Sequence, residues 1–305
     1  MPSTFCLVQG GWKLVLELNW QGEKVTSLFE SIFLGVLQGL TEFLPISSSA
    51  HQRIAGEFFS NAQDPGARFT AITQIGTELA VLIFFRNDIK KIIVAWFRQS
   101  ILRATLSADE KLQARMGWLI IIGSLPIAIL GYLGQDIIRN ELRSLWLIAT
   151  VMIVFGIVLG LADHYGRDNR GLKELSTRHG IFYGLAQSLA LIPGVSRSGA
   201  TIAMGRFLGY NREAALRYSF LLAIPAVFGS GLYELKGALG DTAGTQVYSL
   251  SQTFIATGFA FVVGYAVIAW LLKFVTTRSF MPFIIYRVVL GSTLLILLST
   301  GVINA

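Results

Sequence analysis

The chain has 305 residues, of which 53% are hydrophobic and only 14% are charged, and its mean hydropathy is +0.60. Soluble domains carry about 25% charged residues, so this composition excludes an ordinary soluble protein and places the chain in the lipid bilayer. The formal net charge of +7 is typical of loops beside anionic headgroups, and no nucleic-acid-binding motif accompanies it. We therefore expect no nucleic acid as a partner. A single cysteine excludes an intrachain disulfide.

The first 27 residues mix charged residues with apolar ones, which interrupts the apolar core that a cleavable signal needs. We interpret residues 1–27 as an N-terminal tail, which either lies at the membrane interface or precedes the true start. Residues 28–305 are then expected to form a single polytopic membrane domain.

Six apolar blocks are long enough to cross a bilayer as helices. They cover residues 69–85, 117–134, 145–162, 217–235, 251–272 and 283–303. Two further apolar segments, 28–44 and 180–192, run into the turns PISSSAH and PGVSRSGAT. Proline stops a helix, so each segment predicts a helix pair that enters the membrane and returns. The expected fold is an all-α integral membrane protein with about six transmembrane helices and two re-entrant helix pairs.

The two helix pairs resemble each other. A shift of 149 positions lays Gly35 on Gly184 and Ser47 on Ser196. Chance similarity between apolar, glycine-rich stretches is the alternative, but both helix breaks coincide with both serine clusters, which favours a duplication. We predict repeat halves at about 28–134 and 145–303.

Lysine and arginine set the expected orientation. They concentrate in 86–116 and 163–179 and are scarce in 135–144 and 236–250, so the first two segments are predicted to be cytoplasmic. The first helix pair then lies on the periplasmic side and the second on the cytoplasmic side. Such an inverted repeat places its site between the halves, near the midplane. The chain is expected in the inner (plasma) membrane, crossing it several times.

The first turn brings acidic, amide, hydroxyl and imidazole groups close together. Gln38 and Glu42 are four residues apart and share a helix face that points to the serine run around Ser48, and His51 follows one turn later. An ionisable group inside a membrane is costly, which favours a functional role. The alternatives are a solvated Glu42 at the interface, a packed His51 and a serine run that only caps a helix.

The second turn predicts a phosphate site. Small residues open a helix whose first N–H groups attract anions, and the guanidinium of Arg197 matches phosphate oxygens. The alternative is that Arg197 only reaches a cytoplasmic surface, although Arg206, Arg212 and Arg217 are expected to supply cations there. The candidate phosphate-binding residues are Ser196, Arg197, Ser198, Gly199 and Thr201.

Two other acidic residues receive weaker interpretations. Glu78 lies inside the span 69–85, where it either faces the cavity or makes a structural contact with the other half. Asp163 is expected at the membrane interface.

The strings QGLTEFLPISSSAH and PGVSRSGAT resemble the two signature regions of the undecaprenyl pyrophosphate phosphatase family, of the bacitracin-resistance type, and the resemblance extends from about Leu28 to the C-terminus. It implies hydrolysis of a polyprenyl diphosphate lipid, undecaprenyl diphosphate, to undecaprenyl phosphate and inorganic phosphate. This reaction recycles the lipid carrier of cell-wall synthesis and confers bacitracin resistance. A divalent cation, Mg²⁺ or Ca²⁺, assists in the family.

The family's Glu/Gln-x-x-x-Glu pattern falls on Gln38 and Glu42, which are the expected metal residues, although Gln38 takes the neutral option and removes one charge. Its Ser and His fall on Ser48 and His51, and its second motif falls on Ser196, Arg197 and Thr201. We expect Ser48 to act as nucleophile and His51 as general acid or base.

Two alternatives to this mechanism and function stay open at the sequence level. Water activated by His51 or Glu42 is the rival attacking group. A secondary transporter or flippase for a polyprenyl phosphate lipid is the rival function, because inverted repeats are common in transporters. The sequence also leaves a homodimer open.

Overall fold

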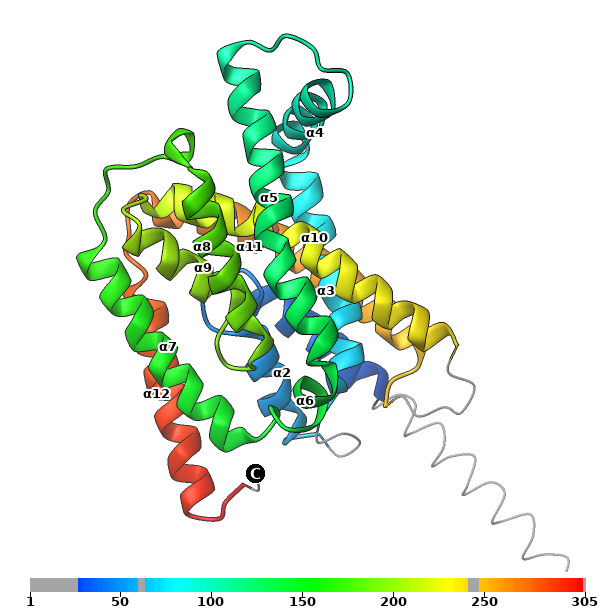
Figure 1. Ribbon diagram of the computed structural model, residues 1–305. Helices are drawn as coiled ribbons and strands as arrows, with labels where there is room; N and C mark the ends of the chain where they lie inside the picture. Colours follow the sequence, from blue (N-terminus) through cyan, green and yellow to red (C-terminus); the bar gives the residue numbers. More distant parts are fainter. Residues whose placement is uncertain (1–26, 60–63, 241–246, 304–305) are drawn as a thin grey trace, which may run out of the picture.

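The computed structural model of the protein describes residues 27–59, 64–240 and 247–303 (Figure 1). The predicted N-terminal tail therefore lies, except for residue 27, outside the described part. Within the described residues the secondary structure is helical, with no strand beyond an isolated bridge between Arg170 and Tyr210. The prediction of an all-α protein is confirmed.

Six helices are long and apolar enough to cross a bilayer. They are α3 (Gly66–Phe84), α5 (Ala108–Leu133), α7 (Leu145–Tyr165), α10 (Arg212–Leu239), α11 (Leu250–Val275) and α12 (Met281–Ser299). Each corresponds to one predicted block, so the number of spans is confirmed. The start of α5 lies well before its apolar block because Ser107 and Glu110 form a capping box and make a polar first turn helical.

Shorter elements connect the six spans. They are α4 (Arg86–Ser100), α6 (Gln135–Asn140) and the 3₁₀ turns η1 (Leu172–Glu174) and η2 (Leu189–Leu191). In Figure 1 the connections that carry α4 and that follow α7 lie at one end of the molecule, whereas α6 and the end of α12 lie at the other. The lysine- and arginine-rich segments therefore share one end, and its assignment to the cytoplasm stays a prediction.

Each motif forms two helices separated by a break. The first pair is the helix Ser27–Thr41 followed by α2 (Ser48–Gly56), and the second is α8 (Thr177–Ser188), continued by η2, followed by α9 (Arg197–Phe207). The two predicted helix breaks are confirmed, whereas the return of each pair to its own side of the membrane stays a prediction. In chain order, three long apolar helices follow each pair.

The two breaks share an unusual backbone conformation. Ser47 has φ 75° and Ser196 has φ 69°, a left-handed region that non-glycine residues seldom adopt. Each serine caps the helix that follows, and its hydroxyl accepts from the N–H three residues later, that of Ala50 at 3.4 Å and that of Gly199 at 3.1 Å. The same costly turn at equivalent positions supports a duplication over chance similarity.

Equivalent glycines let the motif helices cross spans of the opposite predicted half. A Cβ on Gly35 would lie 2.3 Å from the carbonyl oxygen of Ala256 in α11, and a Cβ on Gly184 would lie 2.5 Å from that of Gly123 in α5. Neither position has room for a side chain, so each motif helix lies directly on the backbone of a span from the other half. This interlocking brings the two breaks together in the middle of the protein.

Candidate active site

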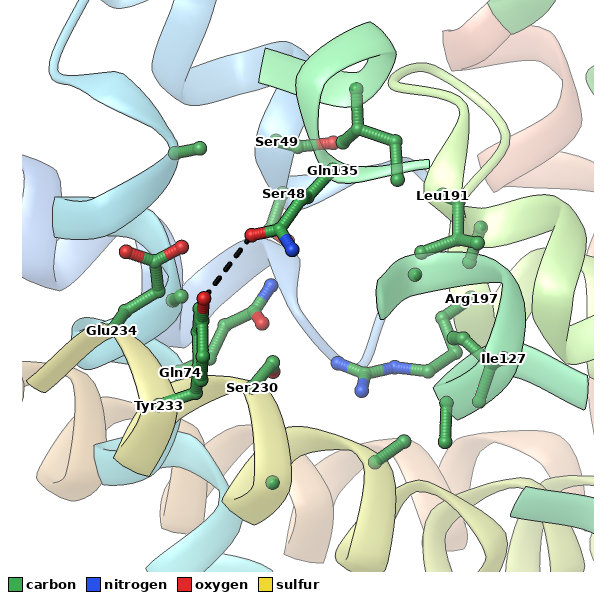
Figure 2. A pocket seen from close by; sticks show the side chains of 18 of the residues that line it. Ser48, Ser49, Gln74, Ile127, Gln135, Leu191, Arg197, Ser230, Tyr233 and Glu234 are labelled. Atoms are coloured by element: carbon green, nitrogen blue, oxygen red, sulfur yellow. Dashed lines mark hydrogen bonds between the residues drawn. The ribbon is translucent and has the colours of Figure 1, made fainter. Parts of the chain in front are cut away.

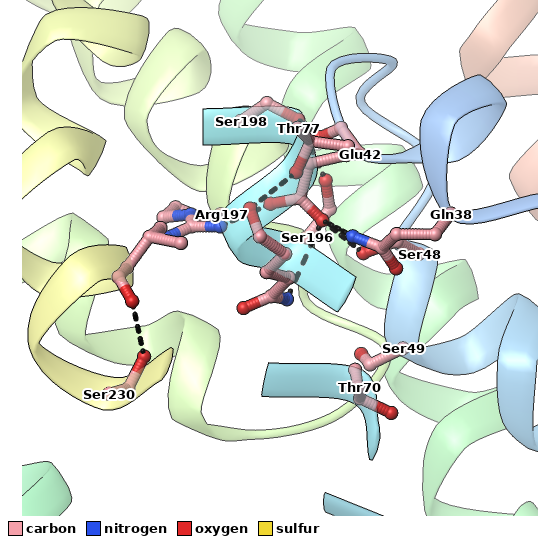
Figure 3. A network of polar contacts seen from close by, with 12 residues as sticks. Gln38, Glu42, Ser48, Ser49, Thr70, Thr77, Ser196, Arg197, Ser198 and Ser230 are labelled. Carbon is pink, nitrogen blue, oxygen red and sulfur yellow. Dashed lines mark hydrogen bonds and ion pairs between the residues drawn. The ribbon is translucent and has the colours of Figure 1, made fainter. Parts of the chain in front are cut away.

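An ion pair joins the two breaks. Arg197, at the start of α9, donates from Nη2 to Oε1 of Glu42, and the two side chains are only 14% and 6% exposed (Figure 3). Burial of either charge alone would be costly, and each neutralises the other. The sequence predicted the two loops as parts of one site, and the structure brings them into direct contact.

The other carboxylate oxygen of Glu42 receives the hydroxyl of Ser48. Ser48 Oγ and Gln38 Nε2 each lie 2.6 Å from Glu42 Oε2, and Gln74 Nε2 lies 3.5 Å from it. An ionised carboxylate only accepts hydrogen bonds, so the serine proton points at Oε2. This is the geometry in which a carboxylate can take a proton from a nucleophile.

A cavity of about 420 Å³ is lined by Ser48 and by the Glu42–Arg197 ion pair (Figure 2). Glu42, Ser48, Ser196 and Arg197 line its polar end, and residues of α5 and α10 form a largely apolar wall. Near the ends of those helices, Tyr233 donates to Gln135 at 3.3 Å. A cavity with an arginine at its polar end and largely apolar walls suits an amphiphile that has an anionic head and a hydrocarbon tail.

Three of the predicted phosphate-binding residues make contacts within the protein, and their role toward phosphate stays a prediction. Ser198 Oγ donates to the carbonyl of Leu44 at 3.1 Å, and the N–H of Gly199 donates to Ser196 Oγ. Thr201 is fully buried, and its hydroxyl lies 2.6 Å from Ser219 Oγ. These residues fix the second loop and join it to the first, while Ser196 and Arg197 line the large cavity.

His51 lies beside the first loop and contacts neither Ser48 Oγ nor Glu42 through a hydrogen bond. Its Nδ1 is 2.7 Å from the carbonyl of Ser47, so Nδ1 carries the proton and Nε2 accepts from the hydroxyl of Tyr286 at 2.7 Å. The two rings stack with centroids 5.5 Å apart. The role of His51 in proton transfer stays a prediction, and sequence reasoning missed Tyr286, for which no motif gave a signal.

Arg287 also escaped sequence reasoning. This fully buried residue of α12 donates to the carbonyls of Pro45 (3.0 Å), Gly194 (2.7 Å) and Val195 (3.0 Å), which belong to the two breaks, and to that of Met152 in α7 (3.1 Å). One guanidinium therefore holds both loops. An arginine in the middle of an apolar span was the signal that could have revealed it.

Glu78 lies behind the ion pair. It is 1% exposed, its Oε1 has no hydrogen-bond partner among the described residues, and it lines a small cavity together with Glu42, Arg197 and Ser219. Glu78 does not line the cavity of about 420 Å³, and its small cavity also includes residues of α9 and α10, so both interpretations from the sequence stay open.

Two expectations about surface charge are wrong. Arg206, predicted as a surface cation, is 1% exposed and pairs with Asp163 and Asp168. Asp163, expected at the interface, is buried, accepts from Arg212 at 2.7 Å and from the N–H of Phe280 at 3.0 Å. These groups form an internal network because the polar connection after α7 folds back onto α9 and α10.

The Gln38–Glu42 pair does not fit a shared cation. The oxygen of Gln38 accepts from Gln52 Nε2 at 2.7 Å and is turned away from Glu42, and the contacts of the Glu42 carboxylate are N–H and O–H donors. Mg²⁺ and Ca²⁺ require several oxygen ligands. In the described part of the chain no group of three His, Cys, Asp or Glu residues is placed to hold a metal.

The fold and site define a polytopic membrane protein with a buried serine, carboxylate and arginine centre at the end of an amphiphilic cavity. A sequence model of the family described as "Bacitracin resistance protein BacA" matches residues 31–293, and the chain belongs to this family.

Similar proteins carry the name undecaprenyl-diphosphatase. The one from Micrococcus luteus is 59% identical over 276 residues, which cover 90% of this chain and 99% of the relative. The one from Arthrobacter sp. (strain FB24) is 56% identical over 290 residues, which cover 95% and 98%. The undecaprenyl-diphosphatase 2 of Agrobacterium fabrum is 58% identical over 276 residues, which cover 90% and 97%.

Proposed function

We propose that this protein hydrolyses undecaprenyl diphosphate to undecaprenyl phosphate and inorganic phosphate, and so recycles the lipid carrier of cell-wall synthesis and confers bacitracin resistance. Family membership and the names of the relatives support this function. The cavity suits the substrate, because its apolar wall can accept the beginning of a prenyl chain and its inner end offers Arg197 to the diphosphate.

The observation that carries the mechanism is the position of Ser48 Oγ, 2.6 Å from Oε2 of a carboxylate whose other oxygen pairs with Arg197. The Ser48 oxygen attacks the terminal phosphorus while its proton passes to Glu42. The bond between that phosphorus and the bridging oxygen breaks, and its electron pair leaves with undecaprenyl phosphate. Water then attacks the phosphoserine, and the bond between phosphorus and the Ser48 oxygen breaks. Glu42 returns the proton to Ser48, and inorganic phosphate is released. Arg197 stabilises the charge of the transferring phosphoryl group.

A divalent cation, Mg²⁺ or Ca²⁺, belongs to this proposal as a partner that neutralises charge on the diphosphate oxygens. Attack by water without a phosphoserine is the alternative route for the same overall reaction. A transporter has no use for a serine hydroxyl held against a carboxylate, so this contact favours the enzyme over a flippase.

We also propose that the cavity opens to the outer face of the inner membrane. Tyr132, Gln135 and Tyr233 line the cavity near the end of α5, the start of α6 and the end of α10, at the same end of the molecule as the end of α12 in Figure 1. The lysine- and arginine-rich connections lie at the opposite end, which the charge asymmetry assigns to the cytoplasm.

Phosphate release tests the function directly. The purified protein in detergent is given undecaprenyl diphosphate or a short-chain prenyl diphosphate, with and without EDTA, and inorganic phosphate is measured. Release of one phosphate per molecule, with the prenyl monophosphate as the second product, is the expected result. A protein that binds these lipids and releases no phosphate from any of them is a transporter or carrier, and the proposal is then abandoned.

A further inference from the structure

The chemistry of Glu42 fixes the orientation of Gln38. An ionised carboxylate has no hydrogen to donate, so only the NH₂ end of the Gln38 amide can lie at 2.6 Å from Glu42 Oε2. The amide oxygen of Gln38 must then point the other way. The reversed amide would bring two acceptors together, so the chemistry of the carboxylate excludes it.

The same reasoning extends the chain of hydrogen bonds by two more side chains. The oxygen of Gln38 accepts from Gln52 Nε2 at 2.7 Å, and the oxygen of Gln52 accepts from Thr70 Oγ1 at 2.7 Å. Gln38 and Gln52 are both fully buried. Every amide oxygen in this row is therefore occupied by a donor, and none is directed at the Glu42 carboxylate.

The charge of Glu42 is also balanced without a metal ion. Arg197 pairs with Oε1, while Ser48 and Gln38 donate to Oε2. A glutamate at position 38 would reverse this situation, because two carboxylates at hydrogen-bonding distance in a buried site need a proton or a cation between them. The residue at position 38 therefore decides whether this pair attracts a cation.

We propose that the substrate-free protein holds no divalent cation at Gln38 and Glu42, and that the cation enters the cavity already bound to the oxygens of the diphosphate. The statement about the entry of the cation rests on the proposed function, whereas the statement about the substrate-free protein concerns the protein alone. The amide oxygens of Gln38 and Gln52 already accept hydrogen bonds within the protein, so the diphosphate supplies the oxygen ligands of the cation. Arg197 lines the same cavity and can bind the complex.

Binding of Mn²⁺ tests the inference without any turnover. The purified full-length protein in detergent, without substrate, is titrated with Mn²⁺, and the free ion is followed by electron paramagnetic resonance. The wild-type protein is expected to show no saturable site. Gln38→Glu is expected to gain one site per chain, with an apparent affinity at least about tenfold above any binding by the wild type, because it adds a carboxylate opposite Glu42.

The duplication supplies a matched control. Gln187 occupies the position equivalent to Gln38, is fully buried in α8, and has Leu191 where the first half has Glu42. Gln187→Glu also buries a new carboxyl group but provides no second carboxylate, so it is expected to bind Mn²⁺ as weakly as the wild type.

Saturable binding of one Mn²⁺ per wild-type chain that is lost in Glu42→Gln overturns the inference. That comparison needs no folded Gln38→Glu protein, so the test survives failure of the principal variant. The outcome is also separate from the proposed function, because a protein that hydrolyses undecaprenyl diphosphate can pass or fail the Mn²⁺ titration. The claim that the cation enters with the diphosphate is tested by the rate of phosphate release at fixed total substrate and varied cation. This rate is expected to follow the concentration of the cation–diphosphate complex and not that of the free cation.

Discussion

Glu42 and Arg197, 155 positions apart in the chain, form an ion pair that links the two predicted halves of the protein at the inner end of the cavity. Since Glu42 also accepts the hydroxyl of Ser48, one carboxylate connects the predicted nucleophile with the predicted phosphate ligand. In the proposed mechanism the diphosphate and Glu42 therefore contact the same guanidinium. This arrangement explains why both motifs are needed for one site.

Arg197→Lys is expected to remain folded and membrane-inserted but to lose most of its activity, with Arg197→Ala worse still. Lysine offers a point charge in place of a planar fork, so it cannot contact Glu42 and two phosphate oxygens together. The loss should appear in kcat as well as KM, because the phosphoryl group gains charge in the transition state. Initial rates of phosphate release measure both constants.

The control for this substitution is Arg86→Lys, which changes an exposed guanidinium at the start of α4, outside the cavity. It should leave both constants close to those of the wild type. Wild-type rates in Arg197→Lys as well would mean that Arg197 is only an interfacial cation.

Ser48→Ala is expected to lower kcat by about 10²-fold or more, as for removal of a nucleophile. Ser49→Ala should lose far less, because the Ser49 hydroxyl also lines the cavity but, among the described residues, has its hydrogen-bond contact with Ser47 Oγ, at 3.3 Å. Rapid acid quenching of the wild-type reaction with substrate labelled in its terminal phosphate should trap label on Ser48. Near-normal turnover by Ser48→Ala would assign the attack to water.

His51→Ala is expected to lower the rate by about 10²-fold if the imidazole transfers a proton, and Tyr286→Phe, which removes the hydrogen-bond donor to Nε2, should lower it less. The rate of each variant is measured over a range of pH. An equal loss in both variants with an unchanged pH profile would instead indicate that the pair only holds the first loop in place.

The apolar blocks and the two motifs were enough to predict the spans, the helix breaks and the meeting of the two loops. Hydropathy detects a span because lipid leaves the backbone no alternative to internal hydrogen bonding. It does not detect the polar first turn of α5, which depends on the Ser107 and Glu110 side chains. It also does not detect the burial of Arg206, which depends on Asp163 in the last turn of α7.

Within the site, residue type indicated the chemistry but not the direction of each side chain. Ser198 and Thr201 are as polar as Ser196, yet their hydroxyls bind the protein's own backbone and Ser219. His51 turns to Tyr286, a residue 235 positions away. Such choices depend on which distant element packs against the loop, and a linear motif does not contain that information.

The orientation can be tested with single cysteines in a Cys6→Ser background. Cysteine at Gly240, after α10, should react with a membrane-impermeant maleimide in intact spheroplasts. Cysteines at Gln99 in α4 and Asn169 after α7 should react only after lysis, because the lysine- and arginine-rich end is predicted to be cytoplasmic. Equal labelling at all three positions would contradict the predicted inverted topology.

Arg287→Met is expected to lower both stability and kcat, because it leaves the carbonyls of Pro45, Gly194 and Val195 without their donor. Each buried unpaired group costs about 1–3 kcal/mol, which should be visible as a lower thermal midpoint in detergent. The loss of kcat should exceed the loss of folded protein, since the two breaks no longer share a common hydrogen-bond donor.

Arg206→Met is the matched comparison, because it removes another buried guanidinium whose partners lie outside the cavity. It should lose stability while its remaining folded protein keeps near-normal kcat. If both variants lose activity only in proportion to their folded fraction, Arg287 stabilises the fold without positioning the site.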